Sequence, residues 1–259
     1  MTIESQTPGS AQLPGRRFAL RVGLFYASTV GIIGTYLPFF PVWLKAAGID
    51  ASWIGVITAV PSLSRFTVLP FVTAFAERRQ VLRGAIASMA FLAAIGFGIV
   101  GLLHQPLPIL IVFALTACAW TPLGPMTDGY TLKGLARHRD YGPLRLWGSA
   151  SFVVAALGCG WLADMIAAQH LIWIIVAVAT LSAFVSLALD PLQRPKIPMR
   201  TLTRADALLR QPLFLAILIP AALVQGSHAA YYSFASITWQ ESGLDGLTIA
   251  ALWALGVIA

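Results

Sequence analysis

Hydrophobic residues occur along this chain in long blocks that are separated by short polar segments. Seven blocks cover 18–43, 51–76, 84–103, 108–132, 144–163, 171–189 and 213–239, and an eighth begins at Thr248. Each complete block has about 20 residues or more, the length that an α-helix needs to cross a hydrocarbon core of about 30 Å. Strands of a membrane barrel are about half as long. The pattern therefore predicts an all-α polytopic membrane protein.

The composition supports the same class. Apolar residues make up 58% of the chain and charged residues 10%, whereas soluble domains carry about 25% charged residues. The eighth block holds few residues before the chain ends at Ala259. We therefore expect one complete six-helix bundle, helix 7 and the start of helix 8, with the second half truncated. A chain of this kind is not expected to transport a solute on its own.

Basic residues are distributed unevenly between the two sets of loops. Fifteen of the 17 Lys and Arg residues lie in the N-terminal segment and the even-numbered loops, and the odd-numbered loops hold only Lys45. This is the positive-inside pattern. It predicts a multi-pass protein of the inner (plasma) membrane with a cytoplasmic N-terminus. Because the basic excess follows the loops, it gives no support to nucleic-acid binding.

The polar segments divide the chain into four parts. Residues 1–17 are predicted to be a disordered cytoplasmic tail, and residues 18–189 a transmembrane bundle of six helices. Residues 190–212 are polar, basic and Pro-rich, and are predicted to be a cytoplasmic linker; residues 213–259 begin a second bundle. Six helices, a linker and a new set of helices is the plan of transporters that are built from two halves.

Small residues recur at helical spacing in several blocks. Gly31 and Gly34 lie in the first block, Gly84 in the third and Gly160 in the fifth. Small residues allow the backbones of membrane helices to approach closely. We expect these positions to serve helix packing.

Asp128 is an acidic residue inside the fourth block, where a charge is costly and is by default a functional candidate. Thr121, Gly124 and Thr131 share its helix face, so this face is expected to line the bundle interior or an aqueous cavity. Arg145, at the start of the fifth block, lies within about 3 Å of the same depth at 1.5 Å per residue. The spacing predicts an Asp128–Arg145 pair, either as a structural ion pair or as part of a binding site.

Phe152 lies two helical turns beyond Arg145, on the same face. Gly148 and Ser149 leave space between the two side chains. A cation beside a small pocket with an aromatic wall suits a polar or ring-bearing ligand. Ordinary apolar packing of Phe152 remains an alternative.

Two further ionisable groups lie inside the blocks. Arg65 is near the middle of the second block, where it either pairs with Asp128 across the bundle or binds an anionic ligand. His228 is mid-way along the seventh block and shares a face with Tyr232. Because imidazole changes charge near neutral pH, His228 can bind a ligand or carry a proton; a structural hydrogen bond is an equal alternative.

Several segments resemble the major facilitator superfamily. They are YLPFFPVWL at 36–44, IGVITAVPSL at 54–63, YGPLRLWGS at 141–149 and QGSHAAYYSFASITWQ at 225–240. The third segment resembles the G-x-x-R-x-x-G signature that opens helix 5 in lactose permease, the nucleoside–proton symporters and the 3-phenylpropionate transporters. The closest resemblance is to the 3-phenylpropionate group, and it extends over essentially the whole chain.

The resemblance implies roles for particular residues. Asp128 and Arg145 match the carboxylate and the arginine that together bind substrate in lactose permease, and Phe152 matches its stacking aromatic residue. The cytoplasmic motif between helices 2 and 3 is reduced here to TAFAERRQVLR at 73–83. The resemblance assigns a gating role to the charged residues that remain in it, Glu77, Arg78 and Arg79.

These observations together predict a proton-coupled symporter of a small organic solute, with an aromatic monocarboxylate favoured and a sugar or nucleoside as the alternative. The expected substrate-binding residues are Asp128, Arg145, Phe152, Arg65, His228 and Tyr232. A channel or an intramembrane enzyme is a remote alternative, because no filter loop, metal-binding spacing or nucleophile motif is visible in the sequence. We expect a monomer in the lipid bilayer, with solute and protons as partners, no cofactor and no metal.

Overall fold

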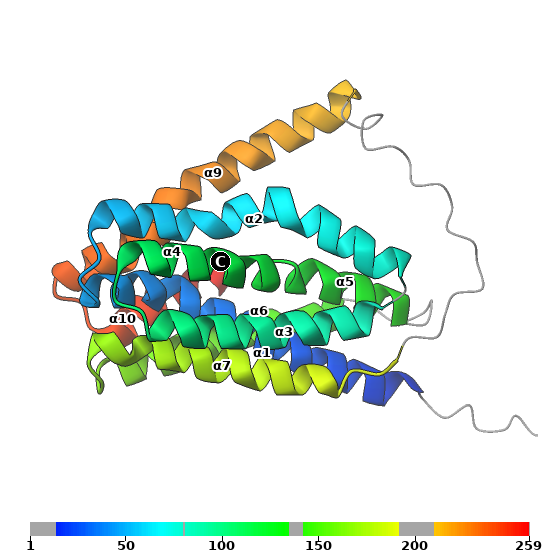
Figure 1. Cartoon of the computed structure of the whole chain (residues 1–259), viewed down its shortest axis with the longest axis horizontal. Coiled ribbons are helices and arrows are strands. Elements are labelled where there is room, and N and C mark those ends of the chain that lie inside the picture. The colour runs from blue at the N-terminus through cyan, green and yellow to red at the C-terminus, as the bar shows by residue number, and fades with distance from the viewer. Residues whose placement is uncertain (1–13, 80, 135–141, 192–209, 259) are drawn as a thin grey trace, which may run out of the picture.

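The structure is a computed structural model that describes residues 14–79, 81–134, 142–191 and 210–258. Its helices run along one axis and form a bundle, with α9 leaning away from it (Figure 1). The elements are α1 (Pro14–Ala46), α2 (Ala51–Arg78), α3 (Leu82–Gly101), α4 (Pro106–Trp120), α5 (Leu123–Gly134), α6 (Gly142–Ala163), the short η1 (Ala168–His170), α7 (Leu171–Leu187), α9 (Pro212–Glu241) and α10 (Gly246–Ile258).

Seven helical segments in the described residues are long and apolar enough to cross a membrane. Their order follows the predicted blocks, and the apolar helix Gly246–Val257 corresponds to the eighth. The prediction of an all-α polytopic protein is thereby confirmed. We call the end of the bundle where α7 ends and α9 begins the linker end, and the opposite end the far end. Residues 1–13 of the predicted tail and most of the predicted linker lie outside the described residues, whereas residues 14–17, which were predicted to belong to the tail, form the first turn of α1.

The fourth predicted span differs from a single helix. It is divided into α4 and α5, which are separated by a turn at Thr121 and Pro122. Proline lacks a backbone N–H and its ring clashes with the preceding turn, and Pro125 follows one turn later. The amides of Thr121 and Met126 still bond to Ala117 and Pro122, at 2.9 and 3.0 Å. The break therefore redirects the helix without leaving these amides unsatisfied.

The core lies between α1, α3 and α4 and is rich in aromatic side chains. Tyr36 is at its centre, with ring centroids 4.9 Å from Phe40 and 4.7 Å from Trp120. Phe113 stacks on Phe40 at 4.8 Å, and Phe97 meets Trp120 at 5.7 Å. Each such pair contributes about 0.5–1.5 kcal/mol beyond its buried area. This cluster fixes α1 against the outer helices and leaves the opposite side of α1 for α6 and the cavity.

Glycines allow close helix approach at two of the predicted positions. A Cβ at Gly34 would lie 2.6 Å from the Phe152 carbonyl oxygen, and one at Gly160 would lie 2.5 Å from the Gly246 oxygen. The α1–α6 and α6–α10 contacts therefore need glycine at these points. The prediction for Gly84 is wrong, because a Cβ there would meet no atom within 4 Å. Its helix face is open, which spacing alone does not reveal.

Polar contacts hold the end of α7 at the linker end. Arg21 of α1 forms an ion pair with Asp190. The Tyr130 hydroxyl of α5 donates to the Asp190 carbonyl oxygen at 2.5 Å, and Arg83 of α3 donates to the Leu187 carbonyl oxygen at 3.2 Å. The Arg83 contact satisfies a carbonyl that the C-terminus of α7 leaves without an intrahelical partner. The other two contacts hold Asp190, which follows the helix. Three helices therefore fix the exit of the chain from the six-helix part.

Candidate substrate cavity

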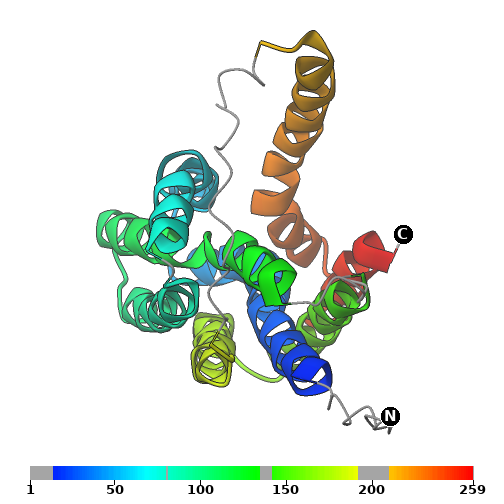
Figure 2. The ribbon, with the colours of Figure 1, turned by 90° about the vertical axis from the view of Figure 1, so that its right-hand side faces the viewer.

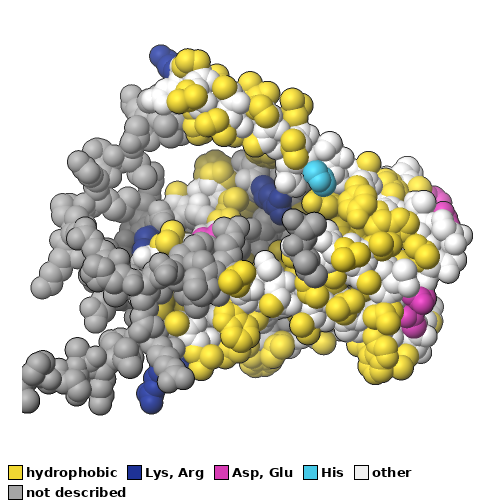
Figure 3. Space-filling view, turned by 180° about the vertical axis from the view of Figure 1, so that it is seen from behind, with side chains coloured by type: hydrophobic (Ala, Val, Ile, Leu, Met, Phe, Trp, Pro, Cys, Tyr) yellow, Lys and Arg dark blue, Asp and Glu magenta, His cyan; other side chains and the backbone are white. Residues whose placement is uncertain are grey.

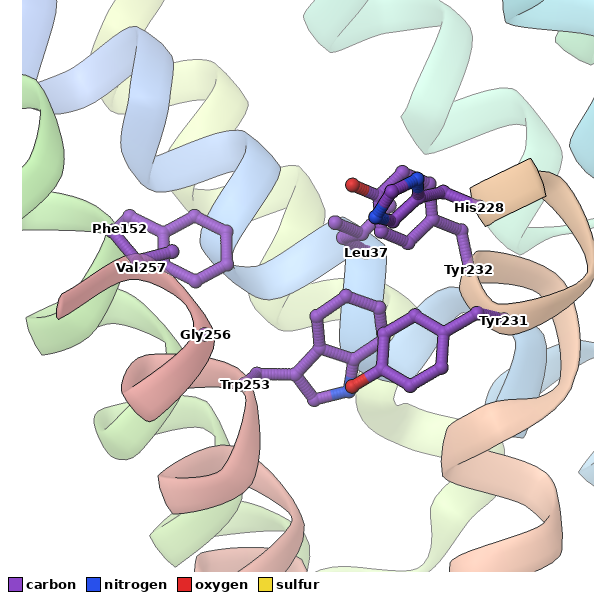
Figure 4. A pocket seen from close by; sticks show the side chains of 8 residues that line it. All are labelled: Leu37, Phe152, His228, Tyr231, Tyr232, Trp253, Gly256 and Val257. Carbon is purple, nitrogen blue, oxygen red and sulfur yellow. The ribbon is translucent and has the colours of Figure 1, made fainter. Parts of the chain in front are cut away.

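A cavity of about 410 Å³ lies between the six-helix part and the two helices that follow it (Figure 4). Four helices line it, and none of them could form it alone. The lining residues are Leu37 of α1, Phe152 of α6, His228, Tyr231 and Tyr232 of α9, and Trp253, Gly256 and Val257 of α10. Its volume falls in the range of small-molecule sites, and its walls are mainly aromatic and apolar.

Three of the predicted substrate-binding residues line this one cavity. Phe152 is buried against α1, and it faces the cavity from the side opposite His228 and Tyr232 (Figure 4). The imidazole and the Tyr232 ring lie 5.5 Å apart between centroids. Segments that are far apart in the sequence are thus brought to one site.

Sequence reasoning missed two of the aromatic residues in the wall. Trp253 lies 5.1 Å from Tyr231 and 5.7 Å from Tyr232 between ring centroids. Its indole N–H donates to Ser236 at 2.9 Å, which fixes the ring plane. The block that contains Trp253 gave no signal of function, because its role depends on how α10 packs against α6. Tyr231 directly precedes the predicted residue Tyr232 but was not itself predicted to bind substrate.

Asp128 accepts a hydrogen bond from the Tyr26 hydroxyl of α1. Its carboxylate is half-buried, which agrees with the interior face that helical phase predicted. The opposite side of α5 is buried as well: Leu123 and Met126 are fully enclosed. Tyr26 was missed as a partner, because the phase of one helix does not identify the neighbouring helix.

The predicted Asp128–Arg145 pair cannot be placed, because the Arg145 side chain lies outside the described residues. Its backbone lies in the first turn of α6, as the sequence predicted. The side chains of Glu77 and Arg78 also lie outside the described residues. Arg79, the third predicted gating residue, is exposed at the linker end and its guanidinium lies over the Phe75 ring at 5.9 Å.

Arg65 is exposed on α2 and forms no ion pair with any described carboxylate, Asp128 included. The proposed structural pairing of Arg65 with Asp128 is therefore wrong for this conformation. On the face seen in Figure 3, basic side chains and a histidine lie beside the hollow between α9 and the bundle.

Helix register places Arg65 near the level of the cavity. The Thr58 hydroxyl lies 2.8 Å from that of Ser233, and α2 and α9 run in opposite directions (Figure 1). Arg65 is seven residues further along α2 and His228 five residues back along α9, about 10.5 and 7.5 Å at 1.5 Å per residue. Measured along the helices from this contact, the backbone positions of Arg65 and His228 therefore differ by about 3 Å.

The far end of the cavity region is closed by direct contacts between the two parts. Asp164, which directly follows the last residue of α6, accepts hydrogen bonds from the Gly246 and Leu247 amides at 2.6 and 3.0 Å. It therefore caps the N-terminus of α10 from α6. Lys45 of α1 forms an exposed ion pair with Glu241 of α9. Among the described residues, no group of three His, Cys, Asp or Glu is placed to hold a metal ion.

Comparisons with known proteins agree with this architecture. The model of the MFS_1 like family matches residues 19–259. The probable 3-phenylpropionic acid transporter of Escherichia coli (strain K12) is 33% identical over 241 residues, which are 87% of this chain and 60% of that protein. Maltose permease of Geobacillus stearothermophilus is 28% identical over 243 residues, covering 90% of this chain and 60% of the permease. The chain thus spans about three fifths of the length of these relatives.

The fold has a counterpart of known structure. The crystal structure of the nucleoside transporter NupG superposes with a TM-score of 0.70 at 16% identity, covering 84% of this chain and 56% of that one. At this identity the likeness concerns the fold alone. The predicted superfamily and fold are confirmed: the chain belongs to the MFS_1 like family of the major facilitator superfamily.

Proposed function

We propose that this chain is part of a secondary transporter that moves a small aromatic monocarboxylate by proton symport and alternating access. The observation that carries the proposal is the cavity with Phe152, Tyr231, Tyr232 and Trp253 in its wall. Aromatic walls suit a planar ring, because they offer apolar area and stacking geometry. Arg65 lies at nearly the same depth and supplies a cation for a carboxylate.

The charge balance supports a singly charged anion. Arg65 and Arg145 carry two positive charges inside the spans, and Asp128 carries one negative charge. A charge inside a bilayer is unfavourable unless it is compensated. We infer that the ligand carboxylate supplies the missing negative charge at Arg65 or Arg145. The ring then lies against Phe152 and Tyr232.

The two relatives by sequence are named for different substrates. The 33% identical relative is named as a probable 3-phenylpropionic acid transporter and the 28% identical one as a maltose permease. NupG, which is similar in fold alone, is named for nucleosides. Sugar hydroxyls need many hydrogen-bond partners, since each hydroxyl buried without one costs about 1–3 kcal/mol. The lining offers His228, Tyr231 and Tyr232 as polar side chains, and the Trp253 N–H is already bonded. We therefore favour the aromatic acid and keep the sugar or nucleoside as the second candidate.

A competition uptake assay tests the substrate class. Uptake of labelled 3-phenylpropionate by cells that produce the full transporter is measured with an excess of unlabelled competitors. We expect aromatic monocarboxylates to compete and maltose and nucleosides to have no effect. Competition by the neutral compounds, and none by the acids, would refute the assignment.

Two residues test the binding site within the same assay. Asp128→Asn removes one charge, and Arg145→Lys removes the bidentate fork that pairs with carboxylates. We expect uptake to fall at least about tenfold in each variant, the loss that one charged hydrogen bond of about 1.5–3 kcal/mol gives. Membrane levels, measured by immunoblot, should stay unchanged. Normal uptake in both variants would leave the pair with a structural role only.

Proton coupling and orientation need separate measurements. Symport predicts that adding the solute to vesicles makes the outer medium more alkaline, because protons enter with the anion. Solute flux without this alkalinisation would favour a channel or a uniporter. The charge bias of the loops supports a cytoplasmic N-terminus. Labelling of single cysteines at the N-terminus with an impermeant reagent tests that orientation in intact cells.

A further inference from the structure

Within the cavity, His228 has one fixed hydrogen bond and one ring nitrogen that is left for a ligand. Its Nδ1 lies 2.6 Å from the Val224 carbonyl oxygen. A carbonyl oxygen can only accept a hydrogen bond, so Nδ1 carries the proton and donates it. In the neutral imidazole, the other nitrogen, Nε2, is therefore an acceptor without a proton.

The position of Nε2 follows from the covalent geometry of the side chain. Nδ1 is bonded to the ring carbon next to Cβ, whereas Nε2 is further from the backbone. Because Nδ1 is held against the helix, the outer edge of the ring extends toward the cavity that His228 lines (Figure 4). Within the described residues, the hydrogen bonds of this ring are made at Nδ1, to Val224 and at 3.5 Å to Ser227. Nε2 has no protein partner there.

Neighbouring groups keep the imidazole in this orientation. The Ser227 hydroxyl donates to the same Val224 carbonyl oxygen at 2.8 Å. The Tyr232 ring lies beside the imidazole, and Tyr232 in turn packs against Trp253. A ring that is held on one side by a hydrogen bond and on another by an aromatic neighbour presents its acceptor in a fixed direction. Such pre-organisation lowers the ordering cost of binding.

We propose that His228 is a specificity-determining residue that selects aromatic acids with a hydroxyl group on the ring. This inference rests on the proposed function: the carboxylate lies toward Arg65 or Arg145 and the ring among the aromatic walls. A phenolic hydroxyl then donates to Nε2. An unsubstituted ring would cover the same acceptor and leave it without a partner, and a site built for a hydroxyl discriminates against analogues that lack one.

The test measures equilibrium binding of 3-phenylpropionate and its ring-hydroxylated derivatives to the purified protein. The wild type is expected to bind at least one hydroxylated acid about tenfold more tightly than the unsubstituted acid, the value of one hydrogen bond. His228→Phe keeps an aromatic ring but removes both nitrogens. It should abolish this preference, because binding of the hydroxylated acid should weaken more than binding of the unsubstituted acid. His228→Gln, which retains an acceptor oxygen, should restore part of the preference.

Leu223→Ala is the control on the same helix, because Leu223 is exposed and does not line the cavity. It should retain the preference of the wild type. Equal weakening of both acids by His228→Phe would overturn the inference, since His228 would then bind the carboxylate or hold α9. Absence of any preference in the wild type would overturn it as well. If the wild type bound neither class of acid, the proposed function itself would fail.

Discussion

The two ends of α9 differ sharply in how they contact the rest of the molecule. Toward the far end, Ser233 bonds to Thr58, Ser236 accepts from Trp253, and Glu241 pairs with Lys45. In the described residues, every side-chain hydrogen bond that α9 makes to another helix begins at Ser233 or beyond. The part of α9 nearer the linker end is exposed and diverges from the bundle (Figures 1 and 2).

This difference shows which contacts join the two parts of the chain. At the far end, the space between them is closed by the close helix contact at Gly160, by the Asp164 cap of α10 and by the ion pair of Lys45 with Glu241. Toward the linker end, the hydrogen bonds of Ser227 and His228 stay within α9. The candidate cavity lies at the boundary between the closed and the diverging parts. A ligand would therefore bind at the point along α9 where its contacts with the bundle end.

The largest effect is expected from Gly160→Val at the α6–α10 contact. A Cβ there would lie 2.5 Å from the Gly246 oxygen and 2.6 Å from the Ala250 Cβ, so the helices must separate. Overpacking of this kind costs about 1–3 kcal/mol. Buried Cys159 is adjacent, and melting followed with a thiol-reactive dye should show a lower transition temperature. Gly158→Val is the control, because a Cβ at Gly158 meets no atom within 4 Å; equal melting of both variants would contradict the contact.

A smaller effect is expected from Asp164→Ala, which removes the cap of α10. The loss of a capping side chain costs about 1 kcal/mol. Asp164→Asn keeps one acceptor oxygen and should lose less. Both variants are compared with the wild type in the same melting assay. Identical stability of all three proteins would show that the far-end cap does not join the two parts.

The smallest effect concerns Asp245, in the turn before α10. Hydrogen bonds from the Thr248 hydroxyl and amide lower the pKa of this carboxyl below its ordinary value of 3.8. A lowered pKa in the folded state means that the stabilisation is present above pH 3.8 and is lost as the pH falls through the lower value. Melting of the wild type should therefore decline over this acid range more than melting of Asp245→Asn. Parallel pH profiles would contradict the assignment.

The sequence was sufficient for the parts of the fold that depend on local pattern. Apolar blocks predicted each long helix, because a helix in lipid must satisfy its own backbone and expose apolar side chains. Helical phase placed Asp128 on an interior face. The apolar pattern gave the fourth span as one block, whereas the structure breaks it into α4 and α5 at Thr121 and Pro122.

Contacts between distant segments could not be predicted in the same way. Tyr26 as the partner of Asp128, Asp164 as the cap of α10 and Trp253 as a cavity wall all depend on which helices meet and at what depth. Hydropathy and spacing give the face of a helix but not its neighbour. Phe152, His228 and Tyr232 were predicted separately, and only tertiary structure places them in one cavity.

The most direct test of the central claim is whether an aromatic acid enters this cavity. Trp253 is the tryptophan that lines the cavity. The fluorescence of Trp253 should therefore change when an aromatic ring binds beside it. We predict a saturable change in tryptophan emission when 3-phenylpropionate or a ring-hydroxylated derivative is added to the purified protein. The change should be largely lost in Trp253→Phe and kept in Trp161→Phe, whose indole is exposed on α6 outside the cavity. No saturable change, or an equal change in Trp253→Phe and the wild type, would contradict the account.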